Sequence, residues 1–177
     1  MELTPDKKAR LLHREILIDL DWLPDSAIGA KGCVFVKAEP AIVWNMLTDY
    51  DNLSKTMPKV ASSKLVEADD STKIIDQSGK SGILFFETIV HFRLKVEEEY
   101  PKHLHFVQIG GDFKIYEGNW VLEEVADGND AGTILTYEAK IKPNFFAPQF
   151  LVSFVQSQDL PTILKGIRSY CESDARR

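Results

Sequence analysis

Residues 83–98, ILFFETIVHFRLKVEE, form the longest two-residue repeat of apolar and polar side chains in the sequence. Successive side chains of a strand point to opposite sides, so the apolar members of this repeat share one face. They are Leu84, Phe86, Val90, Phe92, Leu94 and Val96. A slip of one residue would exchange the two faces. The repeat therefore predicts a long strand with one side on the protein core.

Similar segments lie on both sides of this one along the chain. Residues 60–67, 72–78, 103–109, 115–125 and 133–141 also alternate, and short stretches rich in Asp, Gly, Asn and Pro separate them. Parallel strands need a crossover of a dozen or more residues, so these short separators predict antiparallel neighbours. Two earlier strands are expected at 14–22 and 33–37, with a loop over 24–32.

Helical spacing occurs before and after the strand region. Pro40 suits the first position of a helix over 40–47, and residues 53–57 can add one more turn. Apolar residues three and four apart predict a helix over 146–177. Pro161 removes a backbone donor within it, so we expect a kink or break near 157–160, with Asp159 able to cap the second half. Only this helix is long enough to cover the sheet, which predicts an α+β grip that encloses space between sheet and helix.

Length and composition indicate one globular domain. The chain has 177 residues, 44% of them apolar and 27% charged, and a formal charge of −6. Nucleic acids are bound mainly through Lys and Arg, so we expect no nucleic-acid partner. No run of 18 apolar residues occurs, the first 14 residues lack the apolar core of a secretion signal, and Cys33 and Cys171 form no CxxC motif. A reduced, cytoplasmic protein is the expectation.

Four stretches resemble the START-like (SRPBCC) superfamily, and within it the bacterial polyketide cyclase/dehydrase and lipid-transport family. They are AEPAIVWNMLTDYDNL at 38–53, MPKV with SSK at 57–64, YEGNW at 116–120, and DLP followed by Leu164 at 159–164. The resemblance implies a helix-grip fold over residues 29–177: a curved antiparallel sheet around a long C-terminal helix, with two short helices after the first core strand. Residues 1–28 would be an N-terminal extension, a short helix and strand packed on the domain. Members of the superfamily bind lipids, sterols, quinones or polyketides beneath the last helix, and a minority are aromatase/cyclases.

Seven aromatic residues are the candidate ligand-binding residues. Strand parity and helical spacing place them near the interior, where they would line a cavity: Trp44, Phe86, Phe92, Trp120, Tyr137, Phe150 and Phe154. The competing interpretation is that they only fill the core. Mostly apolar walls with few polar groups are typical of small-molecule sites.

Metal and cofactor sites are not expected. The sequence contains no GxGxxG, P-loop, HExxH or GxSxG motif. His103 and His105 share one strand face at a spacing that can hold a metal, but no Cys or carboxylate cluster accompanies them. The interpretation that remains is a solvated strand end.

No catalytic residue is assigned either. His91 and Arg93 fall on the polar face of the long strand, whereas an acid or base would have to point into the cavity. Asp112 and Lys114 stay weak candidates, because the preceding Gly110-Gly111 pair is typical of a β-bulge that can redirect a side chain.

The favoured function is non-enzymatic binding or transport of a hydrophobic small molecule, such as a lipid, a quinone or a polyketide-like compound. A polyketide aromatase/cyclase and a protein interaction module are the alternatives. Phe145, Phe146 and Phe150 cluster just before the last helix. They are expected to anchor that helix, with a transient membrane contact or a cavity mouth as the other interpretation.

Overall fold

The computed structural model describes residues 3–83, 86–126, 131–144 and 149–175. These residues form one antiparallel sheet of eight strands in the order β1-β2-β8-β7-β6-β5-β4-β3. The strands are β1 Ile16–Trp22, β2 Ile28–Val36, β3 Val60–Ala68, β4 Thr72–Ile83, β5 Phe86–Glu99, β6 His103–Gly111, β7 Phe113–Val125 and β8 Gly132–Pro143. The helices are α1 Pro5–Leu12, α2 Pro40–Thr48, α3 Leu53–Thr56 and α4 Gln149–Asp174, and short 3-10 turns occur at Pro24–Ser26 and Tyr50–Asn52.

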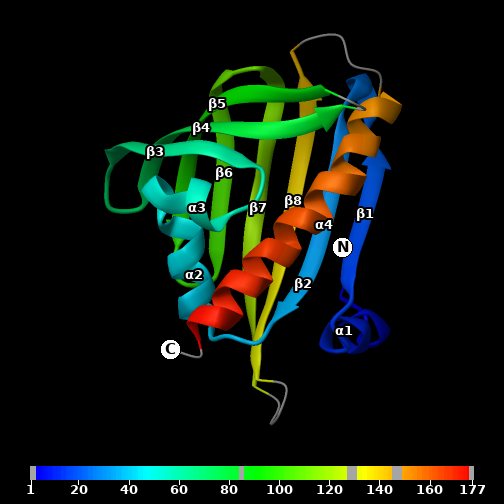
Figure 1. The fold of residues 1–177 in the computed structure, drawn as a ribbon, viewed down its shortest axis with the longest axis vertical. Coiled ribbons are helices and arrows are strands. Elements are labelled where there is room, and N and C mark those ends of the chain that lie inside the picture. Colours follow the sequence, from blue (N-terminus) through cyan, green and yellow to red (C-terminus); the bar gives the residue numbers. More distant parts are fainter. Residues whose placement is uncertain (1–2, 84–85, 127–130, 145–148, 176–177) are drawn as a thin grey trace.

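Helix α4 runs diagonally across one face of the curved sheet, and α2 and α3 lie beside its C-terminal half (Figure 1). This arrangement confirms the predicted helix-grip fold. Strands β3 to β8 are consecutive neighbours in the sheet, so short hairpin connections produce the antiparallel order that the separators predict. None of the described helices has the length and apolar character that a bilayer crossing requires.

The long strand has the predicted register. In β5, Val90, Leu94 and Val96 are buried, while Ile89 and His91 on either side of Val90 are exposed. Leu84 and the side chain of Phe86 lie outside the described part of the structure.

The expected loop over 24–32 is wrong in its second half, because β2 begins at Ile28. This part of β2 pairs with β1 on one side and β8 on the other, as in the opposition of Gly32 to Ile18 and Tyr137. A side chain is missing at position 32 for a packing reason: a Cβ there would lie 2.7 Å from Leu164 Cδ1 on α4. Sheet pairing and the close approach of α4 thus override the weak strand propensity of glycine.

The expected break in the last helix is also wrong. Helix α4 continues through Pro161 from Gln149 to Asp174. Leu160, Leu164 and Ile167 on either side of the proline are almost fully buried against the sheet. Their burial offsets the backbone hydrogen bond that Pro161 cannot donate. Asp159 does not cap a second helix and instead pairs with Lys59.

Apolar residues pack on both faces of the sheet. The main core lies on the α4 side, whereas a smaller cluster that includes Leu11, Leu17, Phe35 and Ile134 lies on the opposite face beneath α1. The N-terminal segment therefore contributes β1 to the sheet and α1 to its back face. Cys33 and Cys171 are buried in these two different clusters and do not form a disulfide with each other.

Gly166 of α4 packs against Pro58 in the loop before β3. A Cβ at this position would lie 2.2 Å from Pro58 Cγ, in a rigid ring that cannot rotate away. Glycine inside a helix normally costs about 1 kcal/mol relative to alanine. At position 166 the overlap of a Cβ with Pro58 opposes the stability that alanine would otherwise add.

We therefore expect Gly166→Ala to lower the free energy of unfolding by about 1–3 kcal/mol, the usual range for overpacking. Urea denaturation followed by circular dichroism measures this change. Gly110→Ala is the matched control, since nothing lies within 4 Å of a Cβ there. An increase in stability for Gly166→Ala would show that α4 and Pro58 are not in contact.

Candidate ligand-binding site

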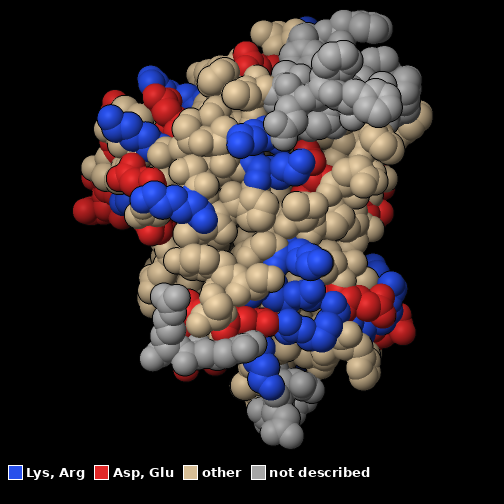
Figure 2. Space-filling view, in the orientation of Figure 1, with Lys and Arg blue, Asp and Glu red and all other residues tan. Residues whose placement is uncertain are grey.

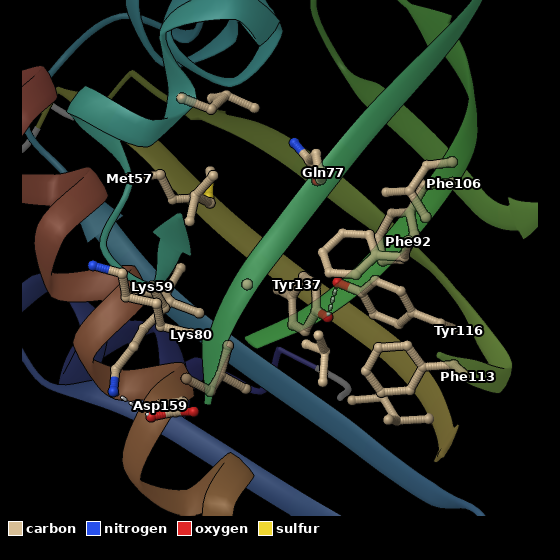
Figure 3. A pocket seen from close by; sticks show the side chains of 18 of the residues that line it. Met57, Lys59, Gln77, Lys80, Phe92, Phe106, Phe113, Tyr116, Tyr137 and Asp159 are labelled. Carbon is tan, nitrogen blue, oxygen red and sulfur yellow. Dashed lines mark hydrogen bonds and ion pairs between the residues drawn. The ribbon is translucent and has the colours of Figure 1, made fainter. Parts of the chain in front are cut away.

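A cavity of about 210 Å³ lies between the sheet and α4. Strands β4 to β8 supply most of its surface, α4 covers it, and residues of the α2–α3 region and the loop before β3 close one side. Most lining residues are apolar, among them Leu53, Val90, Leu94, Val152 and Val155. Two groups of polar side chains, one with Tyr116 and Tyr137 and one with Lys59, Lys80 and Asp159, lie on opposite sides of the cavity in Figure 3, and Tyr50, Gln77 and Gln156 also line it.

Five rings form one side of the cavity, here called the aromatic cluster: Phe92, Phe106, Phe113, Tyr116 and Tyr137. Tyr116 is central to it, with ring centroids 5.2 Å from Phe92, 5.1 Å from Phe106 and 5.2 Å from Phe113. Edge-to-face and tilted contacts at these distances are favourable for aromatic pairs. The rings therefore support one another and leave part of their surface facing the cavity (Figure 3).

Two hydroxyl groups meet within the aromatic cluster. The Tyr116 and Tyr137 oxygens are 3.5 Å apart, and either can donate to the other. Burial raises the pKa of both phenols, that of Tyr137 well above its ordinary value. Both stay protonated at neutral pH, so the pair holds two O–H donors and uses one between them. The second is available to a carbonyl or hydroxyl group of a ligand.

A charged end, formed by Lys59, Lys80 and Asp159, lies opposite the aromatic cluster (Figure 3). Lys59 Nζ is 2.8 Å from Asp159 Oδ1, which joins the loop before β3 to α4. The Lys59 carbonyl accepts a hydrogen bond of 2.7 Å from the Lys80 backbone N–H. Among the described lining residues, only Lys80 is exposed to solvent over a large part of its surface. Lys80 therefore brings the charged end into contact with solvent.

Tyr50 lines the cavity next to α3. Its hydroxyl donates to Glu98 Oε1 at 2.5 Å, and burial is the largest cause of the raised pKa of this phenol. Since its proton already has an acceptor, Tyr50 is less available to a ligand than the pair in the aromatic cluster.

Comparison with known families identifies the domain. The family model described as polyketide cyclase/dehydrase and lipid transport matches residues 36–168. The chain belongs to this family. The resemblance noted in the sequence is thereby confirmed, and the match includes most of the residues that line the cavity.

Solved structures share the fold of this family member at low identity. An aromatase/cyclase from Streptomyces sp. R1128 is 12% identical, with a TM-score of 0.69 over 82% of this chain and 94% of that chain. A STAR-related lipid transfer protein fragment from Xanthomonas axonopodis is 20% identical, with a TM-score of 0.69 over 88% of this chain and 93% of that chain. A START superfamily protein from Mycobacterium smegmatis is 14% identical, with a TM-score of 0.65 over 84% of this chain and 97% of that chain. No curated protein shows significant sequence similarity to the chain.

The structure places three of the seven predicted aromatic residues on the cavity lining: Phe92, Trp120 and Tyr137. Trp44 is buried elsewhere, with its ring edge-on to Tyr100 at 5.4 Å. The side chains of Phe86 and Phe150 lie outside the described part of the structure, as does most of the segment 145–150.

The inward placement of Phe154 needs correction, because 49% of this residue is exposed. The lining residues of α4 are Val152, Val155, Gln156, Asp159, Leu160 and Ile163. These follow the spacing of three and four that one helix face requires, and position 154 falls on the other side. Adjacent apolar residues of a helix do not all share one face, so Val152 and Val155 face the cavity while Phe154 faces solvent.

Sequence reasoning missed Tyr116 and Phe106, although strand parity signals both. Tyr116 lies four residues before Trp120 on β7, and Phe106 lies two residues after the buried Leu104 on β6. Lys59 and Asp159 have no comparable signal. They are 100 positions apart, and only the packing of α4 against the loop before β3 brings them together.

The weaker candidates lie away from the cavity. His103 Nε2 and His105 Nδ1 both approach Asn119 Oδ1, at 2.9 and 3.0 Å. Within the described ranges, no group of three or more potential metal ligands occurs. His91 is exposed, and Arg93 forms an ion pair of 2.5 Å with Asp76 on the outer surface.

The predicted bulge is present but does not redirect Asp112 into the cavity. The register of β5 and β6 shifts between Arg93 and Leu94, opposite Gly110 and Gln108. The Asp112 carboxylate accepts a hydrogen bond of 2.8 Å from the His91 backbone N–H. This carboxylate fixes the end of the strand pair.

The buried phenols predict how stability changes with pH. The pKa of Tyr137 is raised on folding, so above about pH 10 the unfolded chain loses this proton before the folded protein does. The stabilisation that comes from this proton is therefore complete below about pH 10. Above that pH the free energy of unfolding falls by roughly 1.4 kcal/mol per pH unit for each such proton.

We expect Tyr137→Phe to make this fall shallower, as measured by urea denaturation between about pH 8 and 11. Tyr170→Phe, at an exposed ring, is the control and should keep the wild-type slope. Equal slopes in the two variants would contradict the burial of the Tyr137 hydroxyl.

Proposed function

We propose that the protein binds a hydrophobic small molecule in the cavity beneath α4 and carries or senses it without converting it. The observation that carries this proposal is a mainly apolar cavity of about 210 Å³ with a hydroxyl pair on one side and a solvent-exposed lysine on the other. An apolar cavity of about 150 Å³ is enough to stay dry and bind benzene. Ring-containing and acyl compounds, including lipids, quinones and polyketide-like molecules, are therefore the candidate ligands.

Affinity would come mainly from removing apolar ligand surface from water. Burial contributes roughly 25 cal/mol per Å², so each 100 Å² of apolar ligand surface contributes about 2.5 kcal/mol. Lost translational and rotational freedom subtracts from this sum. Where a ligand carries a polar atom at its inner end, the O–H of the Tyr116–Tyr137 pair that is not used between them would bind that atom and fix its orientation.

The protonation state of the cavity groups supports binding over turnover. A general acid or base works best with a pKa near the operating pH, whereas burial moves the pKa of Tyr116 and Tyr137 further above it. Asp159 is already paired with Lys59. Structures with this fold include one named an aromatase/cyclase and one named a lipid transfer protein, and the chemistry of this cavity favours the second kind of role.

Val90→Trp tests the proposal by filling the cavity. Val90 lines it, whereas the adjacent Ile89 is 53% exposed and does not. We expect Val90→Trp to weaken binding of decan-1-ol by roughly tenfold or more, because an indole occupies the space of the ligand. Isothermal titration calorimetry measures the affinity.

Ile89→Trp is the matched control, with the same side chain added to the other face of the same strand. It should bind like the wild type, and circular dichroism of both variants checks that they fold. Wild-type protein that binds no decan-1-ol, or a Val90→Trp variant that binds it unchanged, would contradict the proposed site.

A further inference from the structure

We propose that the ligand is an amphiphile with an anionic head, which lies at Lys80 and Lys59 while its apolar tail extends beneath α4 toward the aromatic cluster. This inference rests on the proposed function and specifies the chemical class of the ligand. It follows from the separation of polar and apolar groups along the cavity.

The two ends of the cavity differ in charge. Phe92, Phe106 and Phe113 surround the inner end, where the only polar atoms contributed by the aromatic cluster are two protonated phenol oxygens. The charged end carries two ammonium groups and one carboxylate, a balance of +1. An uncharged ligand would use the inner end alone. A ligand with an apolar tail and a charged head would use both.

The sign of the head follows from how the three charged groups are paired. Asp159 is 8% exposed and its carboxylate lies 2.8 Å from Lys59, so these two charges largely cancel. Lys80 lines the cavity at its charged end, and its ammonium has no partner among the residues that the structure describes. A cationic head would meet two lysines there. An anionic head would gain a charge-assisted hydrogen bond from Lys80.

The backbone holds the two lysines beside each other. Lys59 has a φ of 69°, in the left-handed region that non-glycine residues rarely adopt. Its carbonyl accepts from Lys80 N–H at 2.7 Å, where β3 and β4 pair through Val60 and Gly79. Such conformations persist where the surrounding structure fixes them, often at ligand sites.

The local charge also contrasts with the rest of the molecule. The chain as a whole has a formal charge of −6. Basic side chains nevertheless occupy part of the surface on the face that α4 crosses (Figure 2). The net negative charge of the chain repels an anion at long range. Recognition of an anionic head therefore depends on the few basic groups at the charged end of the cavity.

Decanoate and decan-1-ol form a probe pair with the same chain length and different heads. Calorimetric titration at low salt is expected to show that wild-type protein binds decanoate roughly fivefold to tenfold more tightly than the alcohol, the effect of one partly exposed charge-assisted hydrogen bond. Added salt should reduce this preference. Acetate, which has the head without the tail, should not bind measurably.

Two variants change the charge at the charged end in opposite directions. Lys80→Gln should weaken decanoate binding and bring the affinities for the two probes within about twofold of each other, because it removes the charge-assisted contact. Asp159→Asn should strengthen decanoate binding, since it frees Lys59 for the head. Lys165→Gln, at an exposed position of α4 outside the lining, is the control for net charge and should match the wild type.

The outcomes separate this inference from the proposed function. Protein that binds neither probe would overturn both. Protein that binds the alcohol as well as or better than decanoate, or that keeps its preference for decanoate in Lys80→Gln, would overturn the anionic head and leave the apolar site standing. Loss of the preference in Lys165→Gln as well would show that net charge, and not the charged end, causes it.

Discussion

The packing of the C-terminal half of α4 against the sheet is the contact on which the rest of the structure depends. Leu164, Ile167 and Cys171 are fully buried there, and Gly32 of β2 leaves room for Leu164. The α4 residues that line the cavity, from Val152 to Ile163, all lie before this contact. One half of the helix thus holds the sheet in its curved form, and the other half covers the space that the curvature creates.

That division explains how an apolar cavity can exist in a protein of this size. Interiors are close-packed, and an empty apolar space costs stability unless surrounding groups keep it open. Here the rings of Phe92, Phe106 and Phe113 pack around Tyr116 at 5.1–5.2 Å between centroids, so they support one another and do not close the space. The ion pair between Lys59 and Asp159 ties α4 to the loop before β3 at the charged end.

Local patterns were enough to predict most of the fold. The alternation in 83–98 set which side of β5 faces the core, because strand side chains repeat every two residues. The errors occurred where a tertiary contact decides the outcome. The local sequence of Ile28 to Gly32 predicts a loop, but pairing with two neighbouring strands and packing against α4 make it part of β2. Pro161 predicts a break, but the burial of Leu160 and Leu164 keeps the helix continuous.

The site was less predictable for the same reason. Phe92, Trp120 and Tyr137 follow from parity within single strands, whereas Phe154 was assigned to the wrong side of its helix. Lys59 and Asp159 belong to segments 100 residues apart, and no local pattern relates them. The most direct test of the central claim is a crystal structure of the protein grown with decan-1-ol. Electron density for the alkyl chain between α4 and the aromatic cluster is the predicted result. A cavity filled by the protein's own side chains, with the alcohol absent or bound elsewhere, would contradict it.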